Sequence, residues 1–207
     1  MGRAYMQRGQ LQIALERLTK ALELNPRSTD AHTVIAVLYE EIRRPERAET
    51  HYRRAVELKP DDGSVNNNYG QFLCRSGRFA EADARFAKAI DDPFYPTPAV
   101  VFTNAGVCAM KSGDLTAADR YLRLALETEP ANPEVLLDLA QLQLAKGEPL
   151  RARAFLQRHE AVAAARPDAL ELGIAIESGL GNTAAVDRYR ARLRTEFPDH
   201  ETAPMLQ

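Results

Sequence analysis

One pattern recurs about every 34 residues along this chain. Each copy first places a large, a small and a second large apolar residue at helical spacing, and then two alanines on either side of a large, often aromatic, residue. The second half of the pattern is clearest in three consecutive copies, at Ala48, Tyr52 and Ala55, at Ala82, Phe86 and Ala89, and at Ala118, Leu122 and Ala125. Steps of three and four residues place these side chains on one face of a helix. A pair of short amphipathic helices cannot bury its apolar faces alone, so successive copies must stack on one another.

A period of this length, often closed by a proline, is typical of the tetratricopeptide repeat (TPR), a helix–turn–helix unit. The sequence therefore predicts an all-α fold, a right-handed TPR solenoid of about six helix pairs that forms a single array over residues 1–207. The units are expected at residues 1–28, 29–62, 63–95, 96–132, 133–166 and 167–198, followed by a short tail at 199–207.

Glycine recurs where the first helix of a unit must end. Glycine adopts the left-handed conformation of a helix cap without a Cβ clash, and it occupies this position at Gly9, Gly77, Gly113 and Gly147. Arg43 stands there in the second unit, and we expect Pro45 to fix that turn instead.

The first unit is expected to be truncated. Gly2 and Tyr5 fall on the small and large positions of its first helix, which places Met1 within that helix. We expect about two helical turns to precede Met1 in the complete protein, lost either at the boundary of an expressed piece or through a start codon assigned too far downstream. A targeting segment would lie in that preceding part.

Composition excludes several function classes. The chain has 27 basic and 29 acidic residues, a net charge of −2, which argues against nucleic acid as the main partner. No stretch approaches the roughly 20 apolar residues of a membrane span. The four histidines (His32, His51, His159 and His200) are scattered, without metal-ligand spacing, and no catalytic constellation or phosphate loop is evident. We expect a non-catalytic protein without a cofactor that binds another protein.

Helix geometry indicates where a partner binds. The first helix of each TPR pair lines the inner side of the solenoid, and its exposed positions change from polar in the second and third units to apolar in later ones. We expect a partner-binding groove at Val100, Thr103, Val107, Leu137, Gln141, Leu170 and Ile174. An apolar inner stripe suits an amphipathic helix or an extended apolar segment of a partner. The alternative is that curvature of the solenoid packs some of these side chains against neighbouring helices.

The connection between the third and fourth units is longer than the period predicts. It reads Ile90-Asp91-Asp92-Pro93-Phe94-Tyr95-Pro96-Thr97-Pro98 and is stiffened by three prolines. Phe94 and Tyr95 either fill the gap that the insertion opens or form a loop contact with a partner.

The two cysteines lie one repeat apart. Cys74 and Cys108 both fall near the ends of first helices in consecutive units, and such helices are neighbours in a solenoid. They are either two small buried thiols or a disulfide that would require an oxidising compartment.

Several segments resemble one TPR family, the type IV pilus biogenesis and stability proteins of the PilW/PilF type. The resemblance covers essentially the whole chain and rests on the Asn66-Asn67-Asn68-Tyr69-Gly70-Gln71-Phe72-Leu73-Cys74 run, the Asp92-Pro93-Phe94-Tyr95-Pro96 loop, Asn104-Ala105-Gly106-Val107-Cys108, Leu170-Glu171-Leu172-Gly173-Ile174 and Phe197-Pro198. It implies a lipoprotein on the periplasmic face of a bacterial outer membrane. The implied role is that of a pilotin, which helps the pilus secretin to reach the outer membrane and to form its multimer. The resemblance also favours the disulfide between Cys74 and Cys108.

In this family a signal peptide and a lipidated N-terminal cysteine provide a lipid anchor, which would precede the present sequence. The alternative function is a cytoplasmic TPR scaffold or adaptor, or the regulatory TPR region of a larger enzyme. Free thiols in the protein from its native compartment would favour that alternative.

Overall fold

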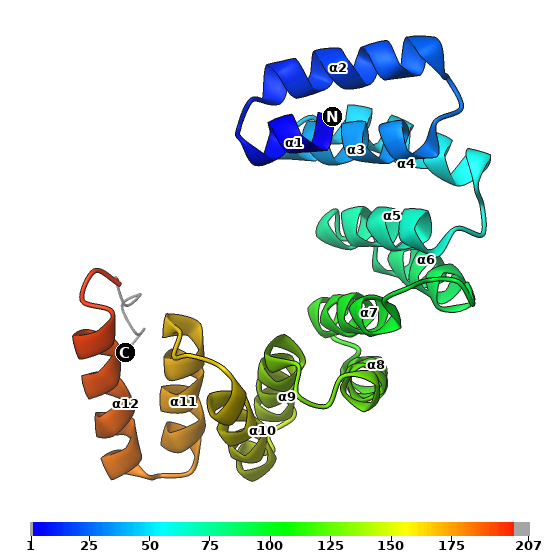
Figure 1. The fold of residues 1–207 in the computed structure, drawn as a ribbon. Helices are drawn as coiled ribbons and strands as arrows, with labels where there is room; N and C mark the ends of the chain where they lie inside the picture. Colours follow the sequence, from blue (N-terminus) through cyan, green and yellow to red (C-terminus); the bar gives the residue numbers. More distant parts are fainter. Residues whose placement is uncertain (1, 201–207) are drawn as a thin grey trace. The chain divides into compact units, whose positions relative to one another are not determined.

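The computed structural model describes residues 2–200, which form twelve α-helices and no strand (Figure 1). The helices are α1 (Gly2–Gln7), α2 (Leu11–Leu24), α3 (Thr29–Glu41), α4 (Pro45–Leu58), α5 (Gly63–Arg75), α6 (Phe79–Ile90), α7 (Pro98–Ser112), α8 (Leu115–Thr128), α9 (Pro133–Ala145), α10 (Pro149–Val162), α11 (Pro167–Gly179) and α12 (Thr183–Glu196). The all-helical TPR fold with six helix pairs is confirmed.

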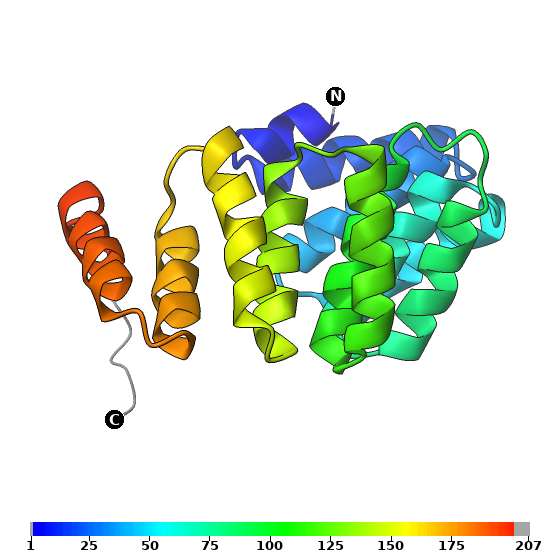
Figure 2. The same cartoon turned by 90° about the horizontal axis from the view of Figure 1, so that it is seen from below.

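The chain divides into two compact units, Met1–Ser112 and Gly113–Gln207. In the first unit α1, α3 and α5 pack against α2, α4 and α6 respectively, and α7 packs against both α5 and α6. In the second unit α8 packs against α9, while α9 with α10 and α11 with α12 form pairs, the last of them orange to red in Figure 2. The single continuous array over the whole chain remains a prediction.

The recurring alanines allow the helices of a pair to approach closely. Ala14, Ala48, Ala82, Ala118 and Ala152 are all 0% exposed. The small position of the first helix works in the same way in the third pair, where a Cβ added at Gly70 would lie 2.8 Å from Cε1 of Phe86. Small residues at these places therefore permit the packing of the large side chains on the partner helix.

The turn inside each pair uses one left-handed residue. Gly9, Gly77, Gly113 and Gly147 all have positive φ, as the sequence predicts. Arg43 also has a positive φ, of 55°, so the expectation that Pro45 fixes this turn another way is wrong. Pro45 instead begins α4, where its missing N–H costs nothing.

Candidate partner-binding site

Cys74 and Cys108 form a disulfide that joins α5 to α7. Their Cα atoms are 5.8 Å apart, and both side chains are buried. The bond links the first helices of consecutive repeats across 34 residues of sequence. It therefore fixes the part of the molecule that carries the long connection between α6 and α7.

That connection, residues 91–97, is anchored at its base by Asp92. Oδ2 of Asp92 accepts a hydrogen bond from the backbone N–H of Gly63 at 2.7 Å, and Oδ1 accepts one from the N–H of Phe94 at 2.9 Å. The carboxylate thus joins the start of α5 to the loop. Sequence analysis missed this role of Asp92, because nothing in its local pattern shows which backbone donor it faces.

The side chain of Tyr95 packs against α5, whereas the side chain of Phe94 is exposed to solvent. The half-buried ring of Tyr95 lies so close to α5 that a Cβ added at Gly63 would be 2.9 Å from its Cδ2 atom. Nδ2 of Asn67 donates to the Tyr95 hydroxyl at 3.4 Å, and Oδ1 of Asn67 accepts from Nδ2 of Asn104 at 2.9 Å. Of the two expected roles for this aromatic pair, gap filling describes Tyr95.

Phe94 is 90% exposed, at the edge of a pocket of about 380 Å³. The pocket is lined by Asp61, Lys88, Asp91, Asp92, Pro93 and Phe94. When a partner covers an aromatic ring on an anchored loop, the loop loses little conformational freedom. The free-energy cost of binding is therefore low, and such a ring is suited to contact a partner.

The Asn66-Asn67-Asn68-Tyr69-Gly70 motif stabilises the third pair. Asn66 is fully buried, and its Nδ2 donates to the carbonyl of Pro60 at 2.7 Å, while Nδ2 of Asn68 donates to the carbonyl of Ser64 at 2.8 Å. Tyr69 is buried and stacks on the ring of Tyr52 with centroids 5.7 Å apart. These contacts give the motif a structural role: they stabilise α5, the helix against which the loop of residues 91–97 is anchored.

The expected groove residues divide into accessible and buried positions. In the first unit Val100 is 42% exposed, and Thr103 and Val107 are partly exposed along α7. In the second unit Gln141 is exposed and Ile174 is partly exposed.

Leu137 and Leu170 are only 3% and 1% exposed, so neither side chain is open to a partner, contrary to the expectation for these two residues. Leu137 belongs to an apolar cluster that includes Ala169 and Leu172 of α11. The physical reason is that consecutive first helices, α9 and α11, pack directly against each other. The alternative named for this stripe, packing against neighbouring helices, describes Leu137.

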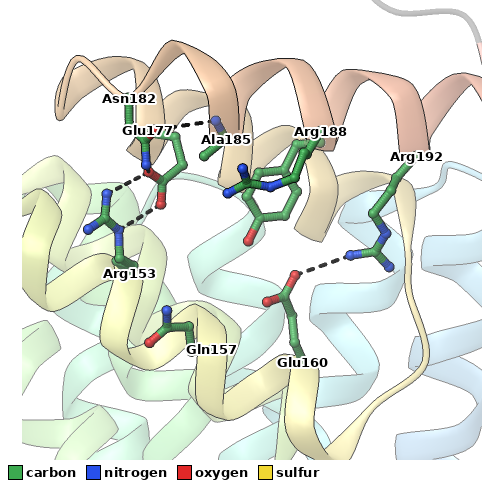
Figure 3. Close-up of a pocket in the computed structure, with 9 residues that line it drawn as sticks. Arg153, Gln157, Glu160, Glu177, Asn182, Ala185, Arg188 and Arg192 are labelled. Atoms are coloured by element: carbon green, nitrogen blue, oxygen red, sulfur yellow. Dashed lines mark hydrogen bonds and ion pairs between the residues drawn. The ribbon is translucent and has the colours of Figure 1, made fainter.

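A second, polar pocket lies in the last two repeats, where α10, α11 and α12 meet (Figure 3). Arg153 of α10 donates two hydrogen bonds to Glu177 of α11, at 2.7 and 2.5 Å. These bonds hold the pKa of Glu177 below its usual value. Asn182 donates to the same carboxylate at 2.9 Å and caps α12 by accepting from the N–H of Ala185. Sequence analysis did not find this cluster, whose residues are separated by up to a full repeat.

Two of the histidines that the sequence showed as scattered are in contact. The Nδ1 atoms of His32 and His51 are 2.9 Å apart, because position 32 of α3 faces position 51 of α4 within one pair. Among residues 2–200, no group of three or more His, Cys, Asp and Glu side chains is arranged to hold a metal ion. No helix in that same range has the length and apolar character needed to cross a membrane.

Comparison with known proteins agrees with this architecture. Models of the tetratricopeptide repeat match residues 1–63, 35–97 and 109–172. The type IV pilus assembly protein PilF of Pseudomonas aeruginosa is 30% identical over 198 residues, which span 96% of this chain and 79% of PilF. The chain belongs to the PilF/PilW family of type IV pilus biogenesis TPR proteins.

Two solved structures of this family are similar along nearly the whole chain. A crystal structure of PilW, described as a widely conserved type IV pilus biogenesis factor, has a TM-score of 0.92 and 34% identity, and the match covers 97% of this chain and 92% of PilW. The structure of Pseudomonas aeruginosa PilF has a TM-score of 0.84 and 30% identity, with 96% of this chain and 90% of PilF covered. The family resemblance drawn from the sequence is thereby confirmed.

Family membership supports a limited set of functional statements. The relatives are non-catalytic TPR factors of pilus biogenesis, and the TPR fold implies protein–protein interaction. Together with the disulfide, the family points to an extracytoplasmic location.

Proposed function

We propose that this protein is a pilotin of the type IV pilus. In this role it binds the pilus secretin and promotes its localisation to the outer membrane and its multimerisation. It acts from the periplasmic face of that membrane, held by a lipid anchor at the N-terminus of the mature protein. The observation that carries the proposal is the similarity to PilF and PilW along nearly the entire chain.

The disulfide supports the proposed compartment. Disulfides persist in oxidising compartments such as the bacterial periplasm and are rare in the cytosol. The bond between Cys74 and Cys108 is therefore consistent with a periplasmic protein and argues against a cytoplasmic scaffold or adaptor, or a regulatory region of a larger cytoplasmic enzyme.

Two surfaces of the described chain are suited to the secretin. The first is the inner face of α7, where Val100, Thr103 and Val107 keep part of their surface exposed. Covering this apolar surface stabilises a complex by about 25 cal/mol per Å². The second surface is the ring of Phe94 on its anchored loop. In the second unit, Gln141 and Ile174 are the proposed contacts that remain accessible.

The proposal is tested in the source bacterium with its own gene deleted. Wild-type protein supplied in trans should restore detergent-resistant secretin multimers, as measured by immunoblot of outer-membrane fractions. Val107→Glu should lower multimer yield severalfold, because it places an unpaired charge where an apolar contact is expected. Gln71→Glu is the matched control, since Gln71 is also a half-buried side chain on a first helix, and this variant should retain the wild-type yield.

Each outcome has a separate meaning. Circular dichroism of the purified variants must show unchanged helix content before the yields are compared. Equal yields from Val107→Glu and Gln71→Glu would move the docking site away from α7, and loss of multimers in Phe94→Ala would place it on the loop. If the wild-type protein does not change secretin localisation or multimer yield at all, the pilotin role is wrong.

A further inference from the structure

The pocket between α10, α11 and α12 has a volume of about 360 Å³ and is built mainly from long polar side chains (Figure 3). Its lining residues are Arg153, Gln157, Glu160, Glu177, Asn182, Ala185, Arg188, Tyr189 and Arg192. Three arginines and two glutamates leave this lining with an excess of positive charge. The volume is at the lower end of the range for small-molecule sites, large enough for one or two residues of a peptide.

The two carboxylates of the pocket already bind side chains of the protein. Glu177 is only 5% exposed, and both of its carboxylate oxygens accept from Arg153, with Asn182 as a third donor. Glu160 forms an ion pair with Arg192 at 3.5 Å. Burial is the main cause that raises the pKa of Tyr189 to about 12, and the nearby Glu160 carboxylate is the second. Neither glutamate is therefore free to receive a donor from a ligand.

The donors of the pocket are only partly used. Arg192 is held by Glu160 and Glu196, and Arg153 by Glu177. Within residues 2–200, the side chains of Arg188 and Gln157 form no hydrogen bond or ion pair, and the charge of Arg188 acts on Glu177 only as a minor cause of its lowered pKa. Figure 3 shows Arg188 reaching from α12 into the pocket and Gln157 projecting from α10 on the opposite side.

We infer that this pocket binds a carboxylate group of a polypeptide. The guanidinium of Arg188 is the principal contact, because its planar N–H donors match the two oxygens of a carboxylate, and the Gln157 amide supplies a further donor. The methyl group of Ala185 and the ring of Tyr189 offer apolar surface for the atoms attached to that carboxylate. A cationic ligand is disfavoured, because the only acidic groups of the pocket are committed to the protein's own arginines.

The site is separate from the surfaces proposed for the secretin. Its residues come chiefly from second helices, α10 and α12, whereas the proposed secretin contacts lie on first helices and on the α6–α7 loop. The inference therefore does not depend on the pilotin role, and it is tested with the purified full chain alone.

The experiment is an NMR titration of isotope-labelled protein at low ionic strength, which follows the Arg Nε–H and Gln side-chain amide signals. The probes are acetylated trialanine with a free C-terminal carboxylate, the same peptide as its C-terminal amide, and an acetylated peptide amide whose central residue is glutamate. Saturable shifts at Arg188 and Gln157 are expected with the carboxylate-bearing probes and not with the trialanine amide. The comparison of the free terminus with the glutamate peptide identifies which source of carboxylate the pocket prefers.

Variants decide whether Arg188 makes the contact. Arg188→Gln should lower the affinity for the better carboxylate probe by about tenfold or more, because a charge-assisted hydrogen bond is lost. Arg188→Lys keeps the charge without the planar fork and should retain part of the affinity. Arg194→Gln is the matched control, an exposed arginine later on the same helix, and it should bind as the wild type does.

Three results would overturn the inference. The first is the absence of any saturable shift at Arg188 and Gln157 with either carboxylate probe. The second is equal binding of the trialanine amide. The third is an Arg188→Gln variant with unchanged affinity, or one that loses no more affinity than Arg194→Gln.

Discussion

At the turn between α3 and α4, an arginine adopts a backbone conformation that glycine adopts in the five other repeats, at Gly9, Gly77, Gly113, Gly147 and Gly181. Arg43 has φ of 55°, and its N–H donates to the carbonyl of Glu40 at 2.9 Å, so the turn is made with the same geometry as at Gly77. A residue with a Cβ atom is disfavoured in this left-handed region by about 1–2 kcal/mol. The chain thus retains one strained residue where its own repeat pattern indicates glycine.

Arg43→Gly should raise the free energy of unfolding by about 0.5–1 kcal/mol, because relief of the strained φ exceeds the entropy that glycine adds to the unfolded chain. The measurement is chemical denaturation followed by circular dichroism. Arg44→Gly is the control, since Arg44 has φ of −119° and gains nothing from glycine. An equal or larger gain in the Arg44 variant would show that the arginine charges, and not the backbone, limit stability here.

Asp138 in α9 gives stability a dependence on pH. Burial and the nearby charge of Glu134 raise its pKa from 3.8 to about 7, although Arg166 acts in the opposite direction. The folded state therefore binds a proton more tightly than the unfolded state. The stabilising contribution of the protonated carboxyl is complete below pH 3.8 and is lost as the pH rises through about 7.

Asp138→Asn should accordingly stabilise the protein by about 1–2 kcal/mol at pH 8, a value reduced from the full pKa shift because the side chain is partly exposed. At pH 4 the gain should nearly vanish, since Asp138 is then protonated in the folded state. Thermal unfolding at the two pH values measures the difference. Asp187→Asn, at an exposed position of α12, should show no such contrast between pH 4 and pH 8.

At the scale of helices, periodicity and turn residues were sufficient to predict the fold. The unit boundaries expected before Thr29, Gly63, Pro133 and Pro167 coincide with the starts of α3, α5, α9 and α11. These positions follow residues that mark helix starts in the sequence, such as Asp62 and Asn132, whose side chains cap the next helix. Local signals of this kind are readable because the interactions they represent span only a few residues.

The candidate site was less predictable, because its contacts join residues about one repeat apart. Helical spacing placed Leu137 and Thr103 at the same position of their units, yet Leu137 is buried and Thr103 is partly exposed. The difference depends on how closely consecutive first helices pack. Asp92 and the Arg153–Glu177 pair likewise acquire their roles from partners 24 to 29 residues away. Sequence spacing alone does not specify which side chains meet over such separations.

At the scale of the whole molecule, stability in a repeat protein is approximately a sum over neighbouring repeats. A constraint placed between two repeats should therefore act mainly on the compact unit that contains them. The disulfide lies between α5 and α7, within Met1–Ser112, and the second unit, Gly113–Gln207, contains no cysteine.

Removing the disulfide should destabilise the first unit selectively. The bond closes a loop of 34 residues, and the entropy of such a loop corresponds to roughly 3–4 kcal/mol. Reduced protein should keep its helix content at room temperature, because each helix still packs against its neighbours, but its first unit should unfold at a lower temperature.

Hydrogen exchange followed by mass spectrometry should show faster exchange in α5 and α7 and little change in α9 to α12. The Cys74→Ala/Cys108→Ala variant should reproduce this pattern and be insensitive to reductant. Equal acceleration in both units would mean that the chain unfolds as one cooperative body, and no change in either would mean that packing alone fixes α5 against α7.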